Sequence, residues 1–296
     1  MKLLLFGGTG QIGTELRELS LPQDVELVAP PRSVVDLEDP VAISRIIAAE
    51  RWAAVINAAG FTNVDRAESE ETNAYAVNEK AAGCLAEETS KRDIPIIHIS
   101  TDYVFDGRKG LPYVETDIAS PLNAYGRSKL AGEHAVRAAN PRHVILRTAW
   151  VFSPFRNNFV RTILRLAQER DRLTIVADQR GCPTAARDIA RTCVEIALHC
   201  VTKPERTRYG VYHFAGAGEA TWFEFAKSIV DMASGQFPHS PRVVPIQTAD
   251  YPTAAIRPAN SRLDCTAITQ DFGVVLRPWR SSLAETIDRL KKQGTP

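Results

Sequence analysis

The chain has 296 residues, with 36 Lys and Arg against 35 Asp and Glu, so its formal net charge is +1. This length allows one large domain or two modest ones and a substantial core. A hydrophobic share of 44% and a charged share of 24% are typical of a folded globular protein and exclude a disordered chain. The near-neutral charge argues against a broad basic surface for nucleic acid, although a local basic pocket remains open.

The five cysteines form an odd set without a CxxC pair. This pattern predicts small buried side chains in a reducing compartment rather than disulfides or a zinc site. The first apolar run stops at glycines after Phe6 and is too short for a secretion signal. No apolar run is long enough to span a bilayer. We therefore expect a cytoplasmic protein that is not bound to a membrane.

In the first half, short apolar runs alternate with longer segments of helical spacing. The runs lack a period of two, which is typical of parallel strands with both faces covered. We predict strands over 2–6, 25–28, 53–56, 94–99 and 143–146, and helices over 41–49, 72–89 and about 123–139. The alternation predicts an α/β fold, a doubly wound parallel sheet with right-handed crossovers.

The second half is less regular. Helices are predicted over 159–168, 188–198, 221–229 and 281–291, and strands over 173–176 and 209–214. Thr221 and Glu224 have the spacing of a capping box. Prolines from 236 onward argue against long elements there. We expect an N-terminal domain over 1–150 and a smaller C-terminal lobe over 151–296 that is mainly substrate-binding and interleaved with the sheet.

A glycine-rich turn follows the first predicted strand. Gly7, Gly10 and Gly13 allow a tight turn, close approach of a pyrophosphate and close packing of the next helix. The amides of Gln11 and Ile12 would begin that helix and face the phosphates. In this strand-and-helix context the turn predicts that the N-terminal domain is an NAD(P)-binding Rossmann domain.

The end of the second predicted strand bears on the choice between NADH and NADPH. No acid that would hold a ribose 2′-hydroxyl follows this strand directly. Arg32 and Ser33 can meet a 2′-phosphate, which favours NADPH, whereas a solvated loop arginine is the alternative. Asp36 and Leu37 follow closely and can contact the adenine.

Polar side chains also cluster after the fourth predicted strand. Thr101 lies at the carboxyl end of this central strand, where parallel sheets bind ligands. Tyr125 and Lys129 share one helix face, one turn apart. An ammonium beside a phenol lowers the tyrosine pKa, which would allow proton exchange with a carbonyl or alcohol near neutral pH. Such a pair is common alone, but its combination with the glycine turn is specific.

The phrases LLFGGTGQIG, VINAAGFTNVDRAE, HISTDYVFDG, SPLNAYGRSKLAGE and RPANSRLD extend this combination over most of the chain. Together they resemble the extended short-chain dehydrogenase/reductase family. The phrase STDYVFDG separates the chain from the sugar-nucleotide epimerases and dehydratases of that family. The resemblance implies hydride transfer from NADPH or NADH to the C4 keto group of a dTDP-linked 4-keto-6-deoxy sugar.

The resemblance also implies roles for individual residues. Tyr125 would give a proton to the C4 oxygen, Thr101 would hydrogen-bond the same oxygen, and Lys129 would hold the nicotinamide ribose. Asp102 and Trp150 would contact the sugar, with core packing as the alternative for Trp150. The cofactor would meet Gly10, Gln11 and Ile12 at its pyrophosphate, Asp36 and Leu37 at its adenosine, and Ala58, Ala59 and Thr62 at its ribose and nicotinamide.

A substrate with a pyrophosphate needs cationic contacts, and the C-terminal half offers Arg156, Arg161, Arg257 and Arg262 as candidates or as solvated surface residues. Some relatives bind magnesium at a dimer interface through glutamates. Glu15 matches one such position, but Arg187 stands where a further acid would help, so we predict no metal site. The oligomeric state is left open between monomer and homodimer.

Two alternatives stay open. One is a reductase or epimerase that acts on another nucleotide sugar. The other is a non-catalytic regulatory relative of the same fold that works as a binding partner. The presence of Thr101, Tyr125 and Lys129 argues against the second alternative.

Overall fold

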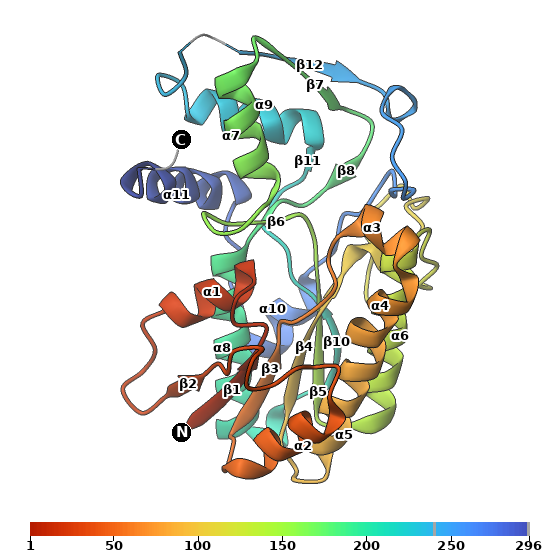
Figure 1. Cartoon of the computed structure of the whole chain (residues 1–296), viewed down its shortest axis with the longest axis vertical. Helices are drawn as coiled ribbons and strands as arrows, with labels where there is room; N and C mark the ends of the chain where they lie inside the picture. Colours follow the sequence, from red (N-terminus) through yellow and green to blue (C-terminus); the bar gives the residue numbers. More distant parts are fainter. Residues whose placement is uncertain (239–240, 295–296) are drawn as a thin grey trace.

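The computed structural model describes residues 1–238 and 241–294, so 239–240 and 295–296 of the predicted C-terminal lobe lie outside the described residues. Its main sheet has six parallel strands in the order β10-β5-β4-β3-β1-β2 (Figure 1). These strands are β1 (Lys2–Phe6), β2 (Glu26–Val28), β3 (Ala54–Asn57), β4 (Ile96–Thr101), β5 (His143–Thr148) and β10 (Gly210–His213). The predicted doubly wound α/β sheet is confirmed, and its order reverses between β1 and β3.

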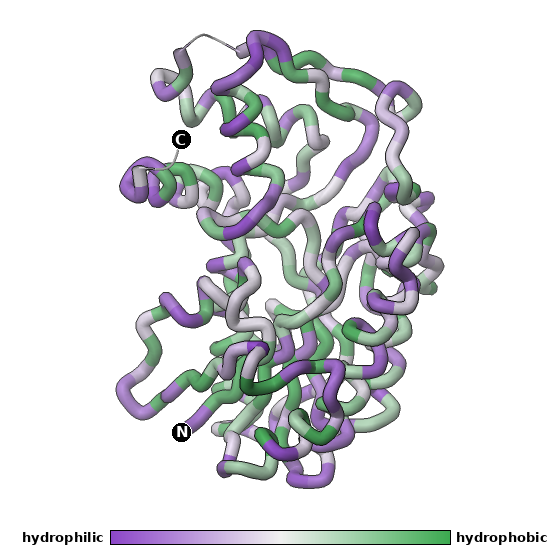
Figure 2. The backbone as a smooth tube through the Cα atoms, in the orientation of Figure 1, coloured by the Kyte–Doolittle hydropathy of each residue, from purple (hydrophilic) through white to green (hydrophobic). Residues whose placement is uncertain are grey.

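Both faces of this sheet are buried, which explains the continuous apolar runs. In β1, Leu3 and Leu5 pack toward one core, whereas Leu4 and Phe6 pack toward another. One face is covered by α1 (Gln11–Glu18), α8 (Ala186–Thr202) and α10 (Thr266–Phe272), and the other by α2 (Pro40–Ala49), α5 (Ala82–Ser90) and α6 (Ala124–Ala139). Figure 2 shows the hydrophobic segments gathered along the strands between these helices.

The single helix predicted over 72–89 is divided. After α3 (Val64–Ser69), the chain forms α4 (Glu71–Tyr75), a π-helical segment η1 (Ala76–Ala81) and then α5. The π segment turns Asn78 toward the loop that follows β3. There Asn78 Oδ1 accepts from Phe61 N at 2.8 Å and its Nδ2 donates to Phe61 O at 3.1 Å. Such π segments occur frequently at functional sites, and the apolar periodicity of the sequence does not show them.

A second lobe lies beside the carboxyl edge of the sheet (Figure 1). It contains α7 (Phe159–Glu169), α9 (Trp222–Met232), α11 (Trp279–Lys292) and a parallel pair of β7 (Arg172–Val176) with β12 (Arg242–Ile246). Phe225, Ile229 and Leu283 belong to its separate hydrophobic core. The predicted capping box is present, since the side chains of Thr221 and Glu224 each bond the backbone of the other.

Short elements join the two lobes. The pairs are β6 (Val151–Phe152) with β9 (Thr184–Ala185) and β8 (Arg180–Gly181) with β11 (Ala220–Thr221). Three 3-10 turns, η2 (Asp102–Val104), η3 (Pro204–Arg206) and η4 (Thr248–Asp250), complete the named elements. Because α8 and β10 pack with the sheet although they follow residue 150, the chain crosses between the lobes more than once.

The five cysteines are free thiols, and Cys182, Cys193, Cys200 and Cys265 are buried as predicted, whereas Cys84 is half-buried. Within the described residues, no helix has both the length and the apolar character needed to cross a membrane.

A buried ion pair supports the two central strands. Arg147 on β5 donates to Glu133 on α6 at 2.7 and 2.9 Å, and Ser100 on β4 donates to the same carboxylate at 2.5 Å. Arg147→Met should therefore leave a buried, unpaired carboxylate and cost about 3–5 kcal/mol of unfolding free energy in urea titrations. Arg165→Met, which removes an exposed pair with Glu169, should cost less than about 0.5 kcal/mol. Equal losses in both variants would contradict this assignment.

Candidate active site

A cleft of about 1140 Å³ lies between the carboxyl edge of the sheet and the second lobe. It includes the point between β1 and β3 where the strand order reverses, which is where open α/β sheets bind ligands. Residues from both lobes line it, among them Gly7, Gly10, Gln11, Thr101, Tyr125, Lys129, Trp150, Trp222 and Arg257.

The glycine-rich turn forms one end of the cleft. Gly7 has a φ of +83°, and a Cβ there would lie 2.5 Å from the carbonyl carbon of Ala58. A Cβ on Gly13 would lie 2.1 Å from Gly7 O, so Gly13 packs α1 against the turn and does not line the cleft. A Cβ on Gly10 would meet only Gly7 O, at 3.5 Å. Gly10 thus leaves open space beside the uncapped first turn of α1, which fits a pyrophosphate.

The residues expected at the adenosine and ribose line the same cleft. These are Arg32, Asp36, Leu37, Ala58, Ala59 and Thr62, together with Ile12. The exposed guanidinium of Arg32 is paired with Asp36 at 3.2 Å and Glu38 at 3.1 Å. The backbone N–H of Glu38, assisted by Arg32, holds the pKa of Asp36 below its usual value. A cofactor phosphate near Arg32 would therefore also face two carboxylates.

Tyr125 and Lys129 project from the first turns of α6 toward the end of β4. Asn123 caps this helix by accepting from Gly126 N at 2.8 Å. A Cβ on Gly126 would lie 2.2 Å from Tyr103 O, so glycine lets the helix approach closely. The Thr101 side chain lies beside Tyr125 and opposes the rise of its pKa, and Lys129 Nζ donates to the Ile99 carbonyl at 2.6 Å. The structure thus brings together the three residues that the sequence picked out on two different elements.

Burial dominates the protonation of this group. It raises the pKa of Tyr125 to about 12, against the opposing hydrogen bond from Thr101. It lowers the pKa of Lys129 to about 8, against the attraction of Glu133. The net shift of the Tyr125 pKa is therefore upward, opposite to the lowering expected from Lys129 alone. The reason is that loss of hydration disfavours both the Tyr125 phenolate and the Lys129 ammonium. The ammonium also donates one of its hydrogen bonds to the Ile99 carbonyl rather than to Tyr125.

Asp102 lies directly beside Thr101 and is buried. Its Oδ1 accepts from Thr101 Oγ1 at 3.0 Å. Burial nevertheless raises the Asp102 pKa to about 7, although the neighbouring hydroxyls of Ser261 and Thr101 favour the charged form. Near neutral pH this carboxyl can therefore either donate or accept a hydrogen bond in the cleft.

Trp150 both lines the cleft and packs against the two hydrophobic cores, so the two interpretations of this residue coexist. Its φ of +46° is in the left-handed region, which is strained for a bulky side chain. The ring stacks on Trp222, with centroids 3.5 Å apart and planes within 5°. A Cβ on Gly181 would lie 2.3 Å from the Trp150 ring, so glycine makes room for it. Trp222 was missed because an aromatic residue in a helical first turn carries no distinguishing pattern.

The four candidate arginines separate into two pairs. Arg156 and Arg257 line the cleft, where Arg156 donates to Thr9 O at 2.7 Å and Arg257 is paired with Asp65 at 2.7 Å. Arg161 and Arg262 bond elsewhere, to Pro154 O at 2.8 Å and to Glu219 at 2.5 Å. Two further cleft arginines, Arg170 and Arg172, were not predicted because nothing in the sequence separates them from surface arginines.

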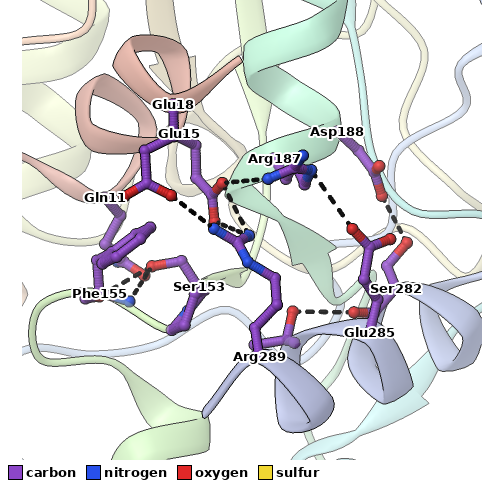
Figure 3. Close-up of polar contacts among 12 residues, drawn as sticks. Gln11, Glu15, Glu18, Ser153, Phe155, Arg187, Asp188, Ser282, Glu285 and Arg289 are labelled. Carbon is purple, nitrogen blue, oxygen red and sulfur yellow. Dashed lines mark hydrogen bonds and ion pairs between the residues drawn. The ribbon is translucent and has the colours of Figure 1, made fainter. Parts of the chain in front are cut away.

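The residues around Glu15 do not fit the magnesium site that the family resemblance suggests. Arg289 donates to both carboxylate oxygens of Glu15, at 2.7 and 2.9 Å, and Arg187 donates to one of them at 3.4 Å (Figure 3). Across the described parts of the chain, no three His, Cys, Asp or Glu side chains are grouped as metal ligands.

A glycine turn at the switch point of a parallel sheet, facing a buried Tyr-Lys-Thr group, defines the class of dinucleotide-dependent α/β oxidoreductases. Comparison with known families gives the particular branch. The family model described as RmlD substrate binding domain matches residues 1–292, and the chain belongs to this family.

Individual relatives agree with this assignment. The chain is 42% identical to a dTDP-4-dehydrorhamnose reductase of Sinorhizobium fredii, over 99% of both chains. It is 44% identical to the enzyme of that name from Aggregatibacter actinomycetemcomitans, over 95% of this chain and 97% of the relative. Among solved structures, a Bacillus anthracis dTDP-4-dehydrorhamnose reductase in complex with NADP superposes with a TM-score of 0.90. It is 31% identical and covers 97% of this chain and 99% of its own.

Asp102 should make stability depend on pH. Because its pKa is raised in the folded state, its contribution is complete below about pH 4 and is lost as the pH rises through about 7. The asparagine of Asp102→Asn stays neutral at every pH, so this variant does not lose that contribution. The melting temperature of Asp102→Asn minus that of the unchanged chain should therefore increase from acidic to alkaline pH. Thermal unfolding across this range measures the difference. A difference that stays flat for Asp102→Asn across this range would contradict the assignment.

Proposed function

We propose that this chain is a reductase that converts dTDP-4-dehydro-6-deoxy-L-mannose to dTDP-L-rhamnose with NADPH. The observation that carries the proposal is the buried Tyr125-Lys129-Thr101 group, which shares one cleft with the glycine turn. The family and the names of the relatives supply the substrate class.

In this proposal Tyr125 is the proton donor. Its raised pKa keeps the phenol protonated at neutral pH, so the proton is in place before the reaction. When bound, the nicotinamide supplies the hydride to the C4 carbon. The resulting C4 alkoxide is a stronger base than a phenolate and takes the proton from the hydroxyl of Tyr125. Thr101 lies beside that hydroxyl, and its single proton, which Asp102 accepts in this structure, can turn to the C4 oxygen and stabilise the charge that develops there.

Lys129 is assigned to the nicotinamide ribose. Its ammonium donates to the Ile99 carbonyl, and a Cβ on Gly60 would lie 3.9 Å from it. The absence of a side chain at Gly60 leaves this donor accessible from the cleft. The positive charge also favours the phenolate that remains on Tyr125 after proton transfer.

The second lobe is assigned to the substrate. The stacked rings of Trp150 and Trp222 offer an apolar wall for the sugar ring, and Asp102 offers a carboxyl to a sugar hydroxyl. Arg156 and Arg257 offer charge-assisted hydrogen bonds to a pyrophosphate. Free cysteines support a reducing setting such as the cytoplasm.

The reaction can be tested directly. The purified protein with NADPH and enzymatically prepared dTDP-4-keto-6-deoxyhexose, epimerised at C3 and C5, should cause loss of absorbance at the nicotinamide band. The absence of oxidation with both NADPH and NADH would end the reductase proposal and leave the regulatory alternative. Activity on another nucleotide sugar but not on the dTDP sugar would instead favour the sibling reductase. An epimerase would turn over without net consumption of cofactor.

Tyr125→Phe removes the proposed proton donor without changing the shape of the ring. We expect kcat to fall by about 10²–10⁴, because a positioned general acid contributes that much. The affinity for NADPH should stay within about twofold, since the proposed cofactor contacts of the phosphates and ribose remain. Tyr209→Phe, which removes a phenol that accepts from Arg142 outside the cleft, is the matched control and should keep its kcat. A Tyr125→Phe enzyme with full kcat would refute the assignment.

Arg32→Ala should change the preference between cofactors. If Arg32 meets the 2′-phosphate, its loss leaves Asp36 and Glu38 beside that phosphate, so KM for NADPH should rise about tenfold or more. KM for NADH should change little. Arg45→Ala, at an exposed position on α2, should affect neither. An equal effect of Arg32→Ala on both cofactors would show that this arginine does not read the phosphate.

A further inference from the structure

The C-terminal helix α11 is joined to α1, the helix that follows the glycine turn, by an ion pair with a fully buried carboxylate (Figure 3). The Arg289 guanidinium donates from Nη1 to both oxygens of Glu15 and from Nη2 to Glu18 at 3.0 Å. Glu15 lies only four residues after Gln11, the first residue of α1. A displacement of this carboxylate therefore moves the helical turn that borders the cleft.

Arg289 also contacts the second segment that borders the glycine turn. Its guanidinium lies 5.3 Å from the centroid of the Phe155 ring. In the same segment, Ser153 Oγ lies 3.1 Å from Gln11 Oε1 and 2.8 Å from Phe155 O, and its single proton can be donated to either oxygen. Gln11 lines the cleft, so one side chain of α11 supports both the start of α1 and the loop beside it.

The charges of this cluster compensate one another. Arg187 joins Glu15 to Glu285 at 3.4 Å on each side, and Arg277 joins Glu285 to Asp188 at 2.9 Å on each side. Four acids therefore face four arginines, namely Glu15, Glu18, Asp188 and Glu285 with Arg187, Arg191, Arg277 and Arg289. A divalent cation, which prefers several uncompensated oxygen ligands, finds none at Glu15.

We propose that Arg289 is a positioning residue for cofactor binding, and that its guanidinium, with that of Arg187, fixes α1 without a metal ion. The buried Glu15 carboxylate is favourable only while it is paired, so α1 must keep the orientation in which Arg289 reaches it. That orientation points the first-turn amides and Gln11 into the cleft. The inference rests on the proposed function for the identity of the cofactor, but on the ion pairs for the role of the residue.

The test measures NADPH binding by fluorescence, together with melting temperature, for Arg289→Met and Arg289→Lys. Arg289→Met should weaken NADPH binding about tenfold or more, because small misplacements of binding groups are costly. With saturating NADPH most of kcat should remain, so the loss appears in KM. Arg289→Lys keeps the charge but not the bidentate geometry and should be intermediate. Arg165→Met removes an exposed arginine of α7 and should bind NADPH normally.

A double variant separates positioning from simple loss of stability. Glu15→Gln combined with Arg289→Met removes both charges, so it should recover melting temperature relative to Arg289→Met alone. Its NADPH affinity should nevertheless stay low, because the direct ion pairs of Arg289 on α11 with Glu15 and Glu18 on α1 are then lost. A folded Arg289→Met protein that binds NADPH within about twofold of the unchanged chain would overturn the proposal. Failure of the unchanged chain to bind NADPH would count against the proposed function instead.

A metal experiment tests the other half of the proposal. Millimolar EDTA or Mg²⁺ should leave the melting temperature and the NADPH affinity of the unchanged chain as they are. A rise in melting temperature with Mg²⁺ that EDTA reverses would show that a cation, rather than the two guanidinium groups, holds Glu15.

Discussion

The close backbone contact between the glycine turn and α1 is the constraint on which the cleft depends. Because a Cβ at Gly13 would lie 2.1 Å from Gly7 O, only glycine lets α1 begin against the end of β1. This contact places the uncapped first turn of α1 at the switch point of the sheet. Glu15, farther along the same helix, then meets Arg289. The position of α1 therefore links the glycine turn, the ion pair between Glu15 and Arg289, and the proposed cofactor site.

Loss of hydration sets the chemistry of the cleft. Tyr125, Lys129 and Asp102 are all buried. Burial raises the pKa values of Tyr125 and Asp102 and lowers that of Lys129, so it favours the neutral form of each group. A tyrosine that stays protonated and a lysine whose pKa is near 8 suit a site that delivers a proton and tolerates a change of charge. The hydrogen bond from Thr101 to Asp102 orients these two side chains, but it does not outweigh the effect of burial on the Asp102 pKa.

Much of the fold was predictable because the signals are local. Apolar runs with two buried faces identified the parallel strands, and the glycine spacing identified the turn at the end of β1. The one-turn spacing of Tyr125 and Lys129 placed both on one helix face. The divided helix around Asn78, the partner of Trp150 and the arginines Arg170 and Arg172 were not predictable, because each depends on a neighbour distant in the chain.

The fold class, the glycine turn and the candidate proton donor could be read from the amino-acid sequence, since they depend on spacing along one or two elements. Only the tertiary structure shows which arginines reach the cleft, that Trp222 stacks on Trp150, and that burial raises the Tyr125 pKa. It also shows that the buried Glu15 carboxylate is paired with Arg289, which lies 274 residues away in the chain. Desolvation and long-range ion pairing depend on what surrounds a group in space, and no local pattern records that.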